Sequence, residues 1–495
     1  MITFSFYFHL LHLAGRIPLP ISKASEPIKA NQSLTGNKKQ PTRRSMAAQK
    51  RRKSAAVAIL NDTDDIEDFS KSETLAIRSS LLRWYDENSR DLPWRTPSVG
   101  AGSLLTPVKV DEEQRAYVVW VSEVMLQQTR VPTVMGYFNR WMEKWPTIRD
   151  LSSASLEEVN EMWAGLGYYR RARFLLEGAK SIVDEGKFPR SASELRCVKG
   201  IGDYTAGAIA SIAFNEVVPV VDGNVVRVIT RLRTISANPK EAGTVKLIWK
   251  LTRQLVDPSR PGDFNQALME LGATLCSSTN PSCSKCPVSD HCQAFLLSKK
   301  SQKLKVTDYP TKVAKNKQRH DFAAVSVVEI AEFDDQILND NGQKHVFLLV
   351  KRPENGLLAG LWEFPSVIMD EGSMNQCMRR KEIDKYLKKS FKLDIGENCK
   401  VMLRQDVGEY VHVFTHIRLQ MYVELLVLTL KEGLTQLNSD EDRSEITWKC
   451  VDGSSIRKMG LSSGVRKVYN MTQDFKEQGV FQKPRKVPRK RRSNN

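Results

Sequence analysis

The stretch 198–228 holds residues whose types and spacing suit the binding of phosphate groups. It reads VKGIGDYTAGAIASIAFNEVVPVVDGNVVRV. Gly200, Gly202 and Gly207 interrupt a helix-forming run, and Gly lets the backbone adopt positive φ and approach a ligand closely. We predict a helix over 205–214, whose first turn would direct free N–H groups out of this Gly-rich hairpin. Such a helix start binds phosphate oxygens without reading sequence, although a Gly-x-Gly before a helix is usually only a turn, so the pattern alone leaves both alternatives open.

Two acidic residues lie in apolar surroundings. Asp222 follows the apolar run 217–221 and precedes a Gly, so it is either held by the fold facing a cleft or an ordinary turn residue. Glu123 lies within the helical sequence VVWVSEVML. Burial there would raise its pKa and let it hold a proton near neutral pH, whereas a Glu at the helix edge would reach solvent. The pattern alone leaves both alternatives open.

Four of the eight cysteines form a compact block, and the other four are scattered. The members of the block are Cys276, Cys283, Cys286 and Cys292. This distribution is typical of a metal site in a reducing compartment and not of a secreted disulfide framework. Four thiolates in so short a loop suit either zinc or an iron–sulfur cluster, and their spacing does not decide between them.

Together these features resemble the endonuclease III superfamily of helix-hairpin-helix DNA glycosylases. The segments LPWR from Leu92, WVSEVMLQQTRV from Trp120 and GLGYYRRAR from Gly165, with the cysteine block, narrow the resemblance to adenine DNA glycosylases of the MutY type. The resemblance implies a monofunctional enzyme of base excision repair that flips adenine out of duplex DNA. It would hydrolyse the N-glycosidic bond of adenine paired with 8-oxoguanine or guanine. It also favours one [4Fe–4S] cluster over zinc, with the cluster loop holding Lys285 against DNA phosphates.

The resemblance assigns catalytic roles to four residues. Glu123 would be the general acid that protonates adenine N7, and Asp222 would stay ionised and stabilise the oxocarbenium-like cation. Tyr204 and Asn224 would assist through hydrogen bonds to Asp222 and to water. Tyr204 stands where lyase relatives carry the Lys that forms a Schiff base, which argues against a bifunctional endonuclease III-like enzyme. The presence of both carboxylates argues against a non-catalytic damage-binding scaffold.

The resemblance also assigns residues that contact the DNA. The hairpin glycines would bind the backbone. Gln128, Leu166 and Tyr168 match the intercalating positions, although the pattern alone also allows a surface Gln and a packed helix start. The residues that match the lining of the adenine pocket are Arg90, Leu92, Trp94, Arg95 and Gln266.

From residue 321 the pattern changes and resembles a Nudix fold. Hydrolysis by that fold requires a helix rich in Glu that holds Mg²⁺, and the corresponding MRRKEIDKYLKK offers only Glu382 and Asp384. We therefore expect binding without hydrolysis. The loop that matches the family's 8-oxoguanine reader consists of Phe414, Thr415 and His416, with Thr where Ser is common.

These sites require a multidomain chain: an all-α helix-hairpin-helix glycosylase domain with an iron–sulfur cluster loop, followed by a smaller α/β Nudix-like domain. The predicted helices span 74–87, 116–127, 131–144, 156–165, 169–185, 193–198, 205–214, 240–256, 264–275 and 374–391. The predicted strands span 322–328, 345–350, 362–367, 411–414 and 419–430. The predicted limits are a disordered basic arm 1–70, the catalytic domain 71–295 with an inserted loop 96–114, a linker 296–320, the Nudix-like domain 321–472 and a basic tail 473–495.

The net charge of +18 lies almost entirely at the two ends of the chain. Residues 1–61 contain eleven Lys and Arg with one acid, and residues 479–495 contain seven with none. The arms would therefore supply a long-range field for double-stranded DNA. We expect a monomer. We also expect no membrane association, because the apolar run 2–14 is too short to span a bilayer. The basic groups at 38–39, 43–44 and 50–53 predict nuclear localisation. The acid-poor N-terminal segment resembles a mitochondrial transit peptide.

Overall fold

The computed structural model describes residues 66–95, 111–314, 317–333, 343–371, 375–431 and 446–478. Most of the predicted arm 1–70, most of the inserted loop 96–114 and the tail beyond residue 478 lie outside the described residues. The chain forms two compact units, Met1–Arg130 with Gly186–Val313, and Val131–Glu185 with Ala314–Asn495. The predicted domain limits remain predictions.

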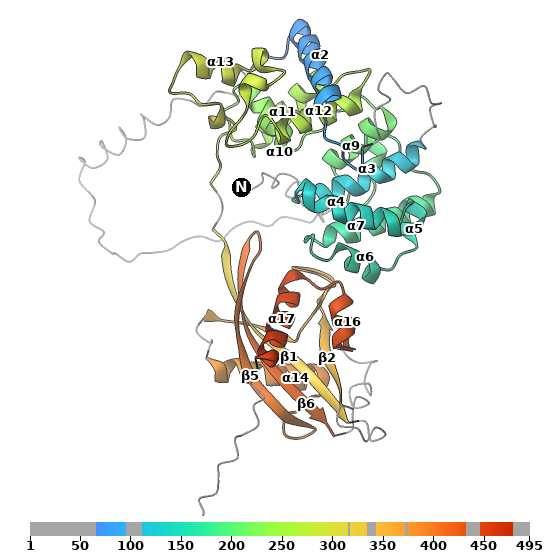
Figure 1. Ribbon diagram of the computed structural model, residues 1–495, viewed down its shortest axis with the longest axis vertical. Coiled ribbons are helices and arrows are strands. Elements are labelled where there is room, and N and C mark those ends of the chain that lie inside the picture. The colour runs from blue at the N-terminus through green and yellow to red at the C-terminus, as the bar shows by residue number, and fades with distance from the viewer. Residues whose placement is uncertain are drawn as a thin grey trace, which may run out of the picture. The chain divides into compact units, whose positions relative to one another are not determined.

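The first unit is helical (Figure 1). Four helices, α2, α10, α11 and α12, pack around one apolar core, and α3 packs against α9. Three short 3₁₀ turns lie C-terminal to α12 in the chain: η2 (Cys283–Lys285), η3 (Ser289–His291) and η4 (Val306–Asp308). The α-helices are α2 (Lys71–Asn88), α3 (Glu112–Leu126), α8 (Ala192–Leu195), α9 (Asp203–Phe214), α10 (Gly223–Leu232), α11 (Ala242–Leu255), α12 (Pro261–Ala273) and α13 (Gln293–Lys300).

The second unit begins with four helices, α4 (Val131–Lys144), α5 (Ile148–Ser152), α6 (Leu156–Trp163) and α7 (Arg170–Glu185). Edge-on indole contacts join Trp141 to Trp145 and Trp163, with ring centroids 4.7 and 5.6 Å apart. These helices are built into the same unit as the sheet, since the Tyr169 hydroxyl donates to the Leu461 carbonyl at 3.1 Å.

A seven-stranded mixed sheet forms the rest of this unit, with the order β3-β2-β1-β6-β5, β4 also paired with β1 and β7 with β2. Strands β1 and β6 are parallel and the other pairs are antiparallel. One face is covered by α14 (Gln376–Phe391) and the other by α16 (Gly453–Lys458) and α17 (Ser463–Glu477) (Figure 1). The strands are β1 (Arg319–Phe333), β2 (Gln343–Lys351), β3 (Trp362–Glu363), β4 (Ser366–Met369), β5 (Cys399–Val413), β6 (Ile417–Leu430) and β7 (Trp448–Asp452).

The fold class is confirmed, and several element predictions are corrected. The strand predicted for 411–414 is the end of the much longer β5, and 362–367 contains two strands, β3 and β4. Helices α10 and α17 and strand β7 were not predicted. The segment 296–320 is not entirely irregular, because α13 ends at Lys300 and β1 begins at Arg319. None of the helices in the described ranges has the length and apolar run needed to cross a bilayer.

Candidate active site

Glu123 is buried on α3, with 6% of its surface exposed. Burial, with a smaller contribution from the nearby charge of Asp222, raises the pKa of this carboxyl to about 7 against the opposing effects of Tyr204 and Arg95. This agrees with the prediction of a carboxyl group that holds a proton near neutral pH, and not with a Glu that reaches solvent. Glu123 is therefore placed to donate a proton to a group that enters the site.

The Tyr204 hydroxyl, on α9, donates a hydrogen bond to Glu123 Oε2. The predicted hydrogen bond from Tyr204 to Asp222 stays a prediction, and the charge of Asp222 also acts on Tyr204. Helix α9 lies directly against α3, so the first turn after the hairpin reaches the buried acid. Burial and the charge of Glu123 raise the pKa of Tyr204 well above its usual value, so this hydroxyl keeps its proton and remains a donor.

Asp222 is the N-cap residue of α10. Its Oδ1 accepts from the Val225 N–H at 2.7 Å, and its Oδ2 accepts from Asn224 Nδ2 at 2.7 Å. The cap satisfies a backbone donor of the first turn and fixes the carboxylate. Burial raises the pKa of Asp222, while these two donors and Arg227 favour its charged form. Asp222 is thus both a structural cap and an acid presented at the site.

Asn224 connects the site to the cysteine loop through Arg227. Arg227 Nη2 donates to Asn224 Oδ1 at 2.7 Å and to the Gly272 carbonyl at 2.6 Å, and its Nε donates to the Cys276 carbonyl at 2.8 Å. A Cβ on Gly272 would lie 2.6 Å from that of Asn224. The hydrogen bond from Arg227 and the close backbone of Gly272 therefore fix the orientation of Asn224.

Sequence reasoning missed one buried acid, Glu270 on α12, which is 1% exposed. It binds both guanidinium groups predicted for the adenine pocket: Arg90 Nη2 lies 2.8 Å and Arg95 Nη2 2.9 Å from Glu270 Oε2. The signal was present, because Glu270 lies in the apolar helical sequence NQALMELG, as Glu123 does in its helix. Leu92 and Trp94 are buried nearby in sequence, and Gln266 Nε2 donates to the Gly262 carbonyl at 3.4 Å.

The three hairpin glycines have different roles. Gly200 has φ +88°, a conformation that favours glycine. Gly202 is the N-cap of α9 without a side-chain cap, so the first N–H groups of the helix stay available. Gly207 does not belong to the exposed hairpin: it is buried within α9, and a Cβ there would lie 2.8 Å from the Pro219 carbonyl oxygen. Its predicted contact with DNA is corrected to a packing role.

Two of the predicted intercalating residues adopt positive φ, Gln128 at 60° and Tyr168 at 50°. Such backbone is uncommon for residues other than glycine and is often found at functional sites. Tyr168 is 47% exposed, whereas Leu166 is buried at 7%. The Gly167 carbonyl between them accepts from Trp163 Nε1 at 2.9 Å, which holds this turn in place.

The Phe414–Thr415–His416 loop is a tight turn between β5 and β6. The Phe414 N–H donates to the Ile417 carbonyl at 2.8 Å, and Gln318 Nε2 donates to the Phe414 carbonyl at 2.8 Å. The Thr415 hydroxyl lies 2.8 Å from the Tyr168 hydroxyl. The second unit thus brings together Tyr168 and the predicted 8-oxoguanine reader.

All four clustered cysteines contact the same apolar core, with Cys292 buried and the other three partly buried. Arg231 Nη1 lies 3.2 Å from Cys276 Sγ, and Lys285 is exposed between Cys283 and Cys286. No three Cys, His, Asp or Glu side chains within the described ranges are arranged as a ready metal-binding group. Four thiols on one loop beside a guanidinium nevertheless match the donor chemistry that an iron–sulfur cluster requires.

Comparisons with known proteins define the class first. Residues 121–254 match the family described as HhH-GPD superfamily base excision DNA repair protein, and residues 337–471 match the NUDIX domain. The fold and the site are therefore those of a helix-hairpin-helix base excision repair protein with a Nudix-like domain.

Individual relatives narrow this class. The chain is 56% identical over 428 residues to the adenine DNA glycosylase of Arabidopsis thaliana, covering 82% of this chain and 65% of that protein. It is 40% identical over 441 residues to the adenine DNA glycosylase of Mus musculus, covering 82% of this chain and 79% of that protein. A thermostable thymine-DNA glycosylase of known structure is 25% identical, with a TM-score of 0.38, over 46% of this chain and all of that one. The chain belongs to the adenine DNA glycosylases.

Proposed function

We propose that this chain is a monofunctional glycosylase that removes adenine from duplex DNA where adenine is paired with 8-oxoguanine or guanine. The proposal rests on two acids of the first unit, Glu123 and Asp222, whose environments favour different protonation states. Glu123 is buried with a pKa of about 7. Asp222 is held by hydrogen bonds from the Val225 N–H and Asn224, which together with the charge of Arg227 favour its ionised form against the effect of burial. Glycoside cleavage uses such a pair, one acid to protonate the leaving group and one carboxylate to stabilise the sugar cation.

In the proposed mechanism, Glu123 transfers its proton to N7 of the flipped adenine, which makes the base a better leaving group. The glycosidic bond then breaks, and the charge that develops on the sugar faces Asp222. Asn224 orients that carboxylate through its 2.7 Å hydrogen bond. Tyr204 donates to Glu123 and is no amine, so no Schiff base forms with the sugar. Water completes the hydrolysis and leaves an abasic site.

Recognition of the opposite base is proposed for the Phe414–His416 turn with Tyr168. 8-Oxoguanine carries an N7–H donor where guanine has an acceptor, and a hydroxyl oxygen can accept from it. The Thr415 hydroxyl, 2.8 Å from that of Tyr168, has a second lone pair for this purpose. The Asp384 carboxylate is bound to Arg404 at 2.8 Å and Glu382 lies 3.8 Å from Lys385, which supports a Nudix-like domain that binds and does not hydrolyse.

The test is excision on duplexes that differ only in the central pair: adenine opposite 8-oxoguanine, guanine or thymine. Alkali then reveals abasic sites. We expect excision in the order 8-oxoguanine, guanine, thymine, with no strand cleavage before alkali. Asp222→Asn should lower the single-turnover rate by on the order of 10²–10³ while duplex binding persists, since it removes one electrostatic contact to the transition state. Near-normal excision by this variant, or cleavage without alkali, would reject the mechanism.

We also propose one [4Fe–4S] cluster held by Cys276, Cys283, Cys286 and Cys292, whose part is to keep the Lys285 loop folded for contact with phosphates. Anaerobically purified protein should contain about four iron and four sulfide ions per chain. Cys283→Ser should reduce the iron content and the DNA affinity. Stoichiometric zinc without iron would replace this proposal.

The cellular site is proposed from residues that lie outside the described ranges. The basic groups within 38–53 support a nuclear location, and the acid-poor start supports import into mitochondria. Fluorescent fusions of the full chain and of a variant lacking residues 1–61 test both. Unchanged distribution of the shortened fusion would remove the basis for the proposal.

A further inference from the structure

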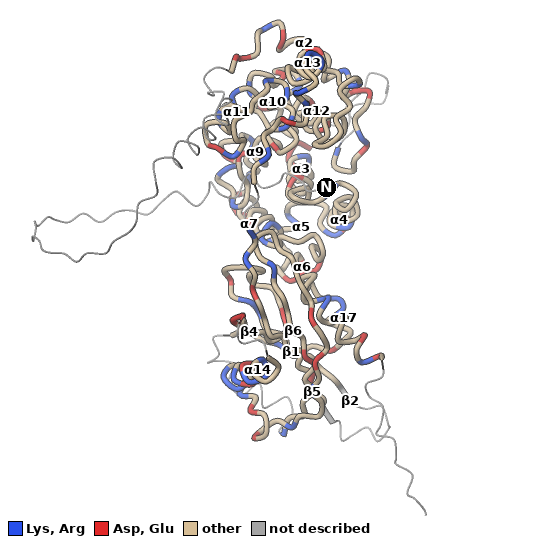
Figure 2. Tube along the Cα trace, turned by 90° about the vertical axis from the view of Figure 1, so that its left-hand side faces the viewer, with Lys and Arg blue, Asp and Glu red and all other residues tan. Residues whose placement is uncertain are grey.

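Helix α14 carries a row of lysines on the face that points away from the sheet. Ile383, Leu387 and Phe391 are buried against the core. On the opposite face, the i, i+4, i+7 spacing aligns three exposed lysines, and a fourth exposed lysine is the C-cap residue, with φ +56°. We call these four the lysine row: Lys381, Lys385, Lys388 and Lys392. Figure 2 shows the concentration of basic residues along α14.

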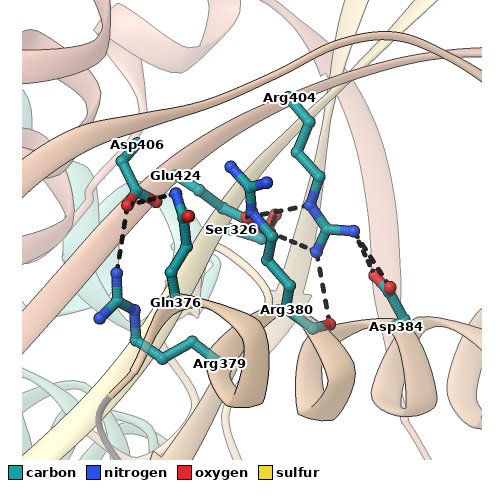
Figure 3. A network of polar contacts seen from close by, with 8 residues as sticks. All are labelled: Ser326, Gln376, Arg379, Arg380, Asp384, Arg404, Asp406 and Glu424. Carbon is teal, nitrogen blue, oxygen red and sulfur yellow. Dashed lines mark hydrogen bonds and ion pairs between the residues drawn. The ribbon is translucent and has the colours of Figure 1, made fainter.

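The two arginines of the same helix pair with carboxylates of the sheet, Arg379 with Asp406 and Arg380 Nε with Glu424 Oε2 at 3.5 Å. Arg379 Nη2 lies 3.2 Å from Asp406 Oδ2, which also accepts from Gln376 Nε2 at 2.8 Å. Arg404, on β5, donates to the Arg380 carbonyl at 3.3 Å and to Asp384 at 3.0 Å. Figure 3 shows this network, which joins α14 to β5 and β6.

Arg404 is also joined to β6 by its 3.0 Å hydrogen bond to Glu424 Oε1, and Glu424 accepts from Ser326 on β1 at 3.0 Å. Glu424 is 6% exposed. Three strands therefore hold the helix through buried charges, so the lysine row is presented on a rigid support. The lysines therefore keep their spacing when a partner binds, and binding does not require the entropic cost of ordering the helix.

The charge of the row is only partly neutralised. Residues 376–392 contain seven Lys and Arg against two acids. Lys388 pairs with Asp394, and Lys385 lies 3.8 Å from Glu382. Neither pair is buried: the side chains of Lys388 and Lys385 are 63% and 75% exposed. Such exposed pairs contribute little and can exchange for a stronger partner.

We propose that the lysine row binds the phosphate backbone of duplex DNA without reading its sequence. From Lys381 to Lys392 the row extends about 16 Å along the helix axis, and an equal length of duplex carries roughly ten phosphate charges. Lysine is a compact point charge suited to phosphates, whereas protein interfaces are poor in lysine and rich in aromatic residues and arginine. The face therefore fits a polyanion better than a protein partner.

This surface is distinct from the lesion-reading turn of the same unit. Asp406, which holds α14, is eight residues along β5 from Phe414, so about 26 Å of strand separates them. The lysine row would contact DNA that is remote from the damaged pair or belongs to a second segment. Its expected effect is on binding of undamaged DNA and not on the chemistry of excision.

The test compares the full chain with the variant K381Q/K385Q/K388Q/K392Q. A matched control, K400Q/K431Q/K458Q/K467Q, removes the same charge from exposed lysines scattered over the same unit. Affinity for an undamaged duplex is measured between 50 and 300 mM KCl. Each lost phosphate contact should reduce the slope of log K against log salt by about 0.9. We expect the slope to become less steep by about 2–4 in the row variant and to change little in the control.

Two further measurements make each outcome decisive. Single-turnover excision at saturating enzyme and the thermal midpoint should match wild type in both variants, because all eight side chains are exposed. An unchanged slope in the row variant, or equal changes in both variants, would overturn the proposal. So would a row variant that loses binding to a polyglutamate peptide while its DNA slope is unchanged, since that result would assign the face to an acidic protein partner.

Discussion

At the residue scale, the proposed chemistry depends on keeping one proton on Glu123. Burial raises its pKa to about 7, so Glu123 is protonated below that pH and loses its proton above it. The reaction needs the proton, and the rate should therefore fall as pH rises through about 7. Burial also raises the pKa of Asp222 above the usual Asp range. Its protonation should reduce the rate at the acidic end.

We predict a bell-shaped dependence of the single-turnover rate on pH, with an alkaline limb near pH 7. Because the two carboxyl groups influence each other, the limbs report on the pair and not on single residues. The measurement uses enzyme in excess over an adenine:8-oxoguanine duplex between pH 5 and 9. The residual activity of Glu123→Gln should lack the alkaline limb. A flat wild-type profile from pH 6 to 9 would contradict the role of Glu123.

Tyr204 should set the pH at which the rate begins to fall on the alkaline side. Its hydroxyl donates to Glu123 and lowers the pKa of the carboxyl by favouring the charged form. We predict that Tyr204→Phe raises the pKa of Glu123 and moves the alkaline limb to higher pH. The control is Met269→Leu, which removes the sulfur that accepts from Tyr204 at 3.5 Å and leaves the bond to Glu123. A limb that stays in place in Tyr204→Phe would show that the hydroxyl does not tune the acid.

At the element scale, predictions from sequence succeeded where burial follows one clear period. The predicted 131–144 helix matches α4 at both ends, and 74–87 lies within α2. Helix α10 was missed because its Val, Ile and Thr residues favour strands. The Asp222 cap and burial of most of the helix override that preference. Most of β5 was missed because two register shifts, at Val401–Leu403 and Asp406–Gly408, break the alternation of a strand.

The residues of the candidate site also differ in how far the sequence could predict them. The role of Glu123 was predictable only through the family resemblance, because the apolar pattern alone also allowed a Glu that reaches solvent from the helix edge. The bond from Tyr204 to Glu123 was not predicted, since it depends on how α9 packs against α3. Helix α17 was predictable in principle: its buried Gly464, Val468 and Thr472 follow a spacing of four.

Gly207 tests the corrected role of the hairpin glycines. A Cβ at this position would lie 2.8 Å from a backbone oxygen of Pro219, which cannot rotate away. We predict that Gly207→Ala lowers the free energy of unfolding by about 1–3 kcal/mol, the usual cost of overpacking. The comparison is Gly243→Ala on α11, where a Cβ meets nothing within 4 Å. Urea unfolding measures both. Equal stability of the two variants would restore a ligand-contact role for Gly207.

At the scale of the whole molecule, the second unit joins elements that are far apart in sequence. Gly460 packs so closely on α6 that a Cβ would lie 2.5 Å from the Asn160 backbone. Arg173 on α7 binds Glu354 at 2.6 Å. Tyr168, just before α7, reaches Thr415 in the turn between β5 and β6. These contacts hold the Tyr168 turn and the Phe414–His416 turn in one arrangement, so lesion recognition should depend on both.

Selection of the base opposite adenine should depend on the Thr415 hydroxyl. Most adenines are correctly paired with thymine, and the catalytic acids can reach only the flipped adenine, so discrimination must come from contacts with the opposite base. We predict that Thr415→Val narrows the preference for adenine opposite 8-oxoguanine over adenine opposite guanine. One lost hydrogen bond is worth about 1 kcal/mol, or roughly fivefold in the ratio of rates or affinities. Residual excision of both pairs should persist, because Glu123 and Asp222 belong to the other unit.

The contribution of Tyr168 separates through a double-mutant cycle. Tyr168→Phe and Thr415→Val each break the 2.8 Å contact between the two hydroxyls, so the double variant should lose less than the sum of the single losses. Phe174→Leu, on α7, is the control that leaves both hydroxyls in place. The measurement is the ratio of single-turnover rates and affinities on the two duplexes for each variant. If the ratio is unchanged in stable Thr415→Val protein, and also in protein shortened before residue 321, the catalytic region alone distinguishes 8-oxoguanine from guanine.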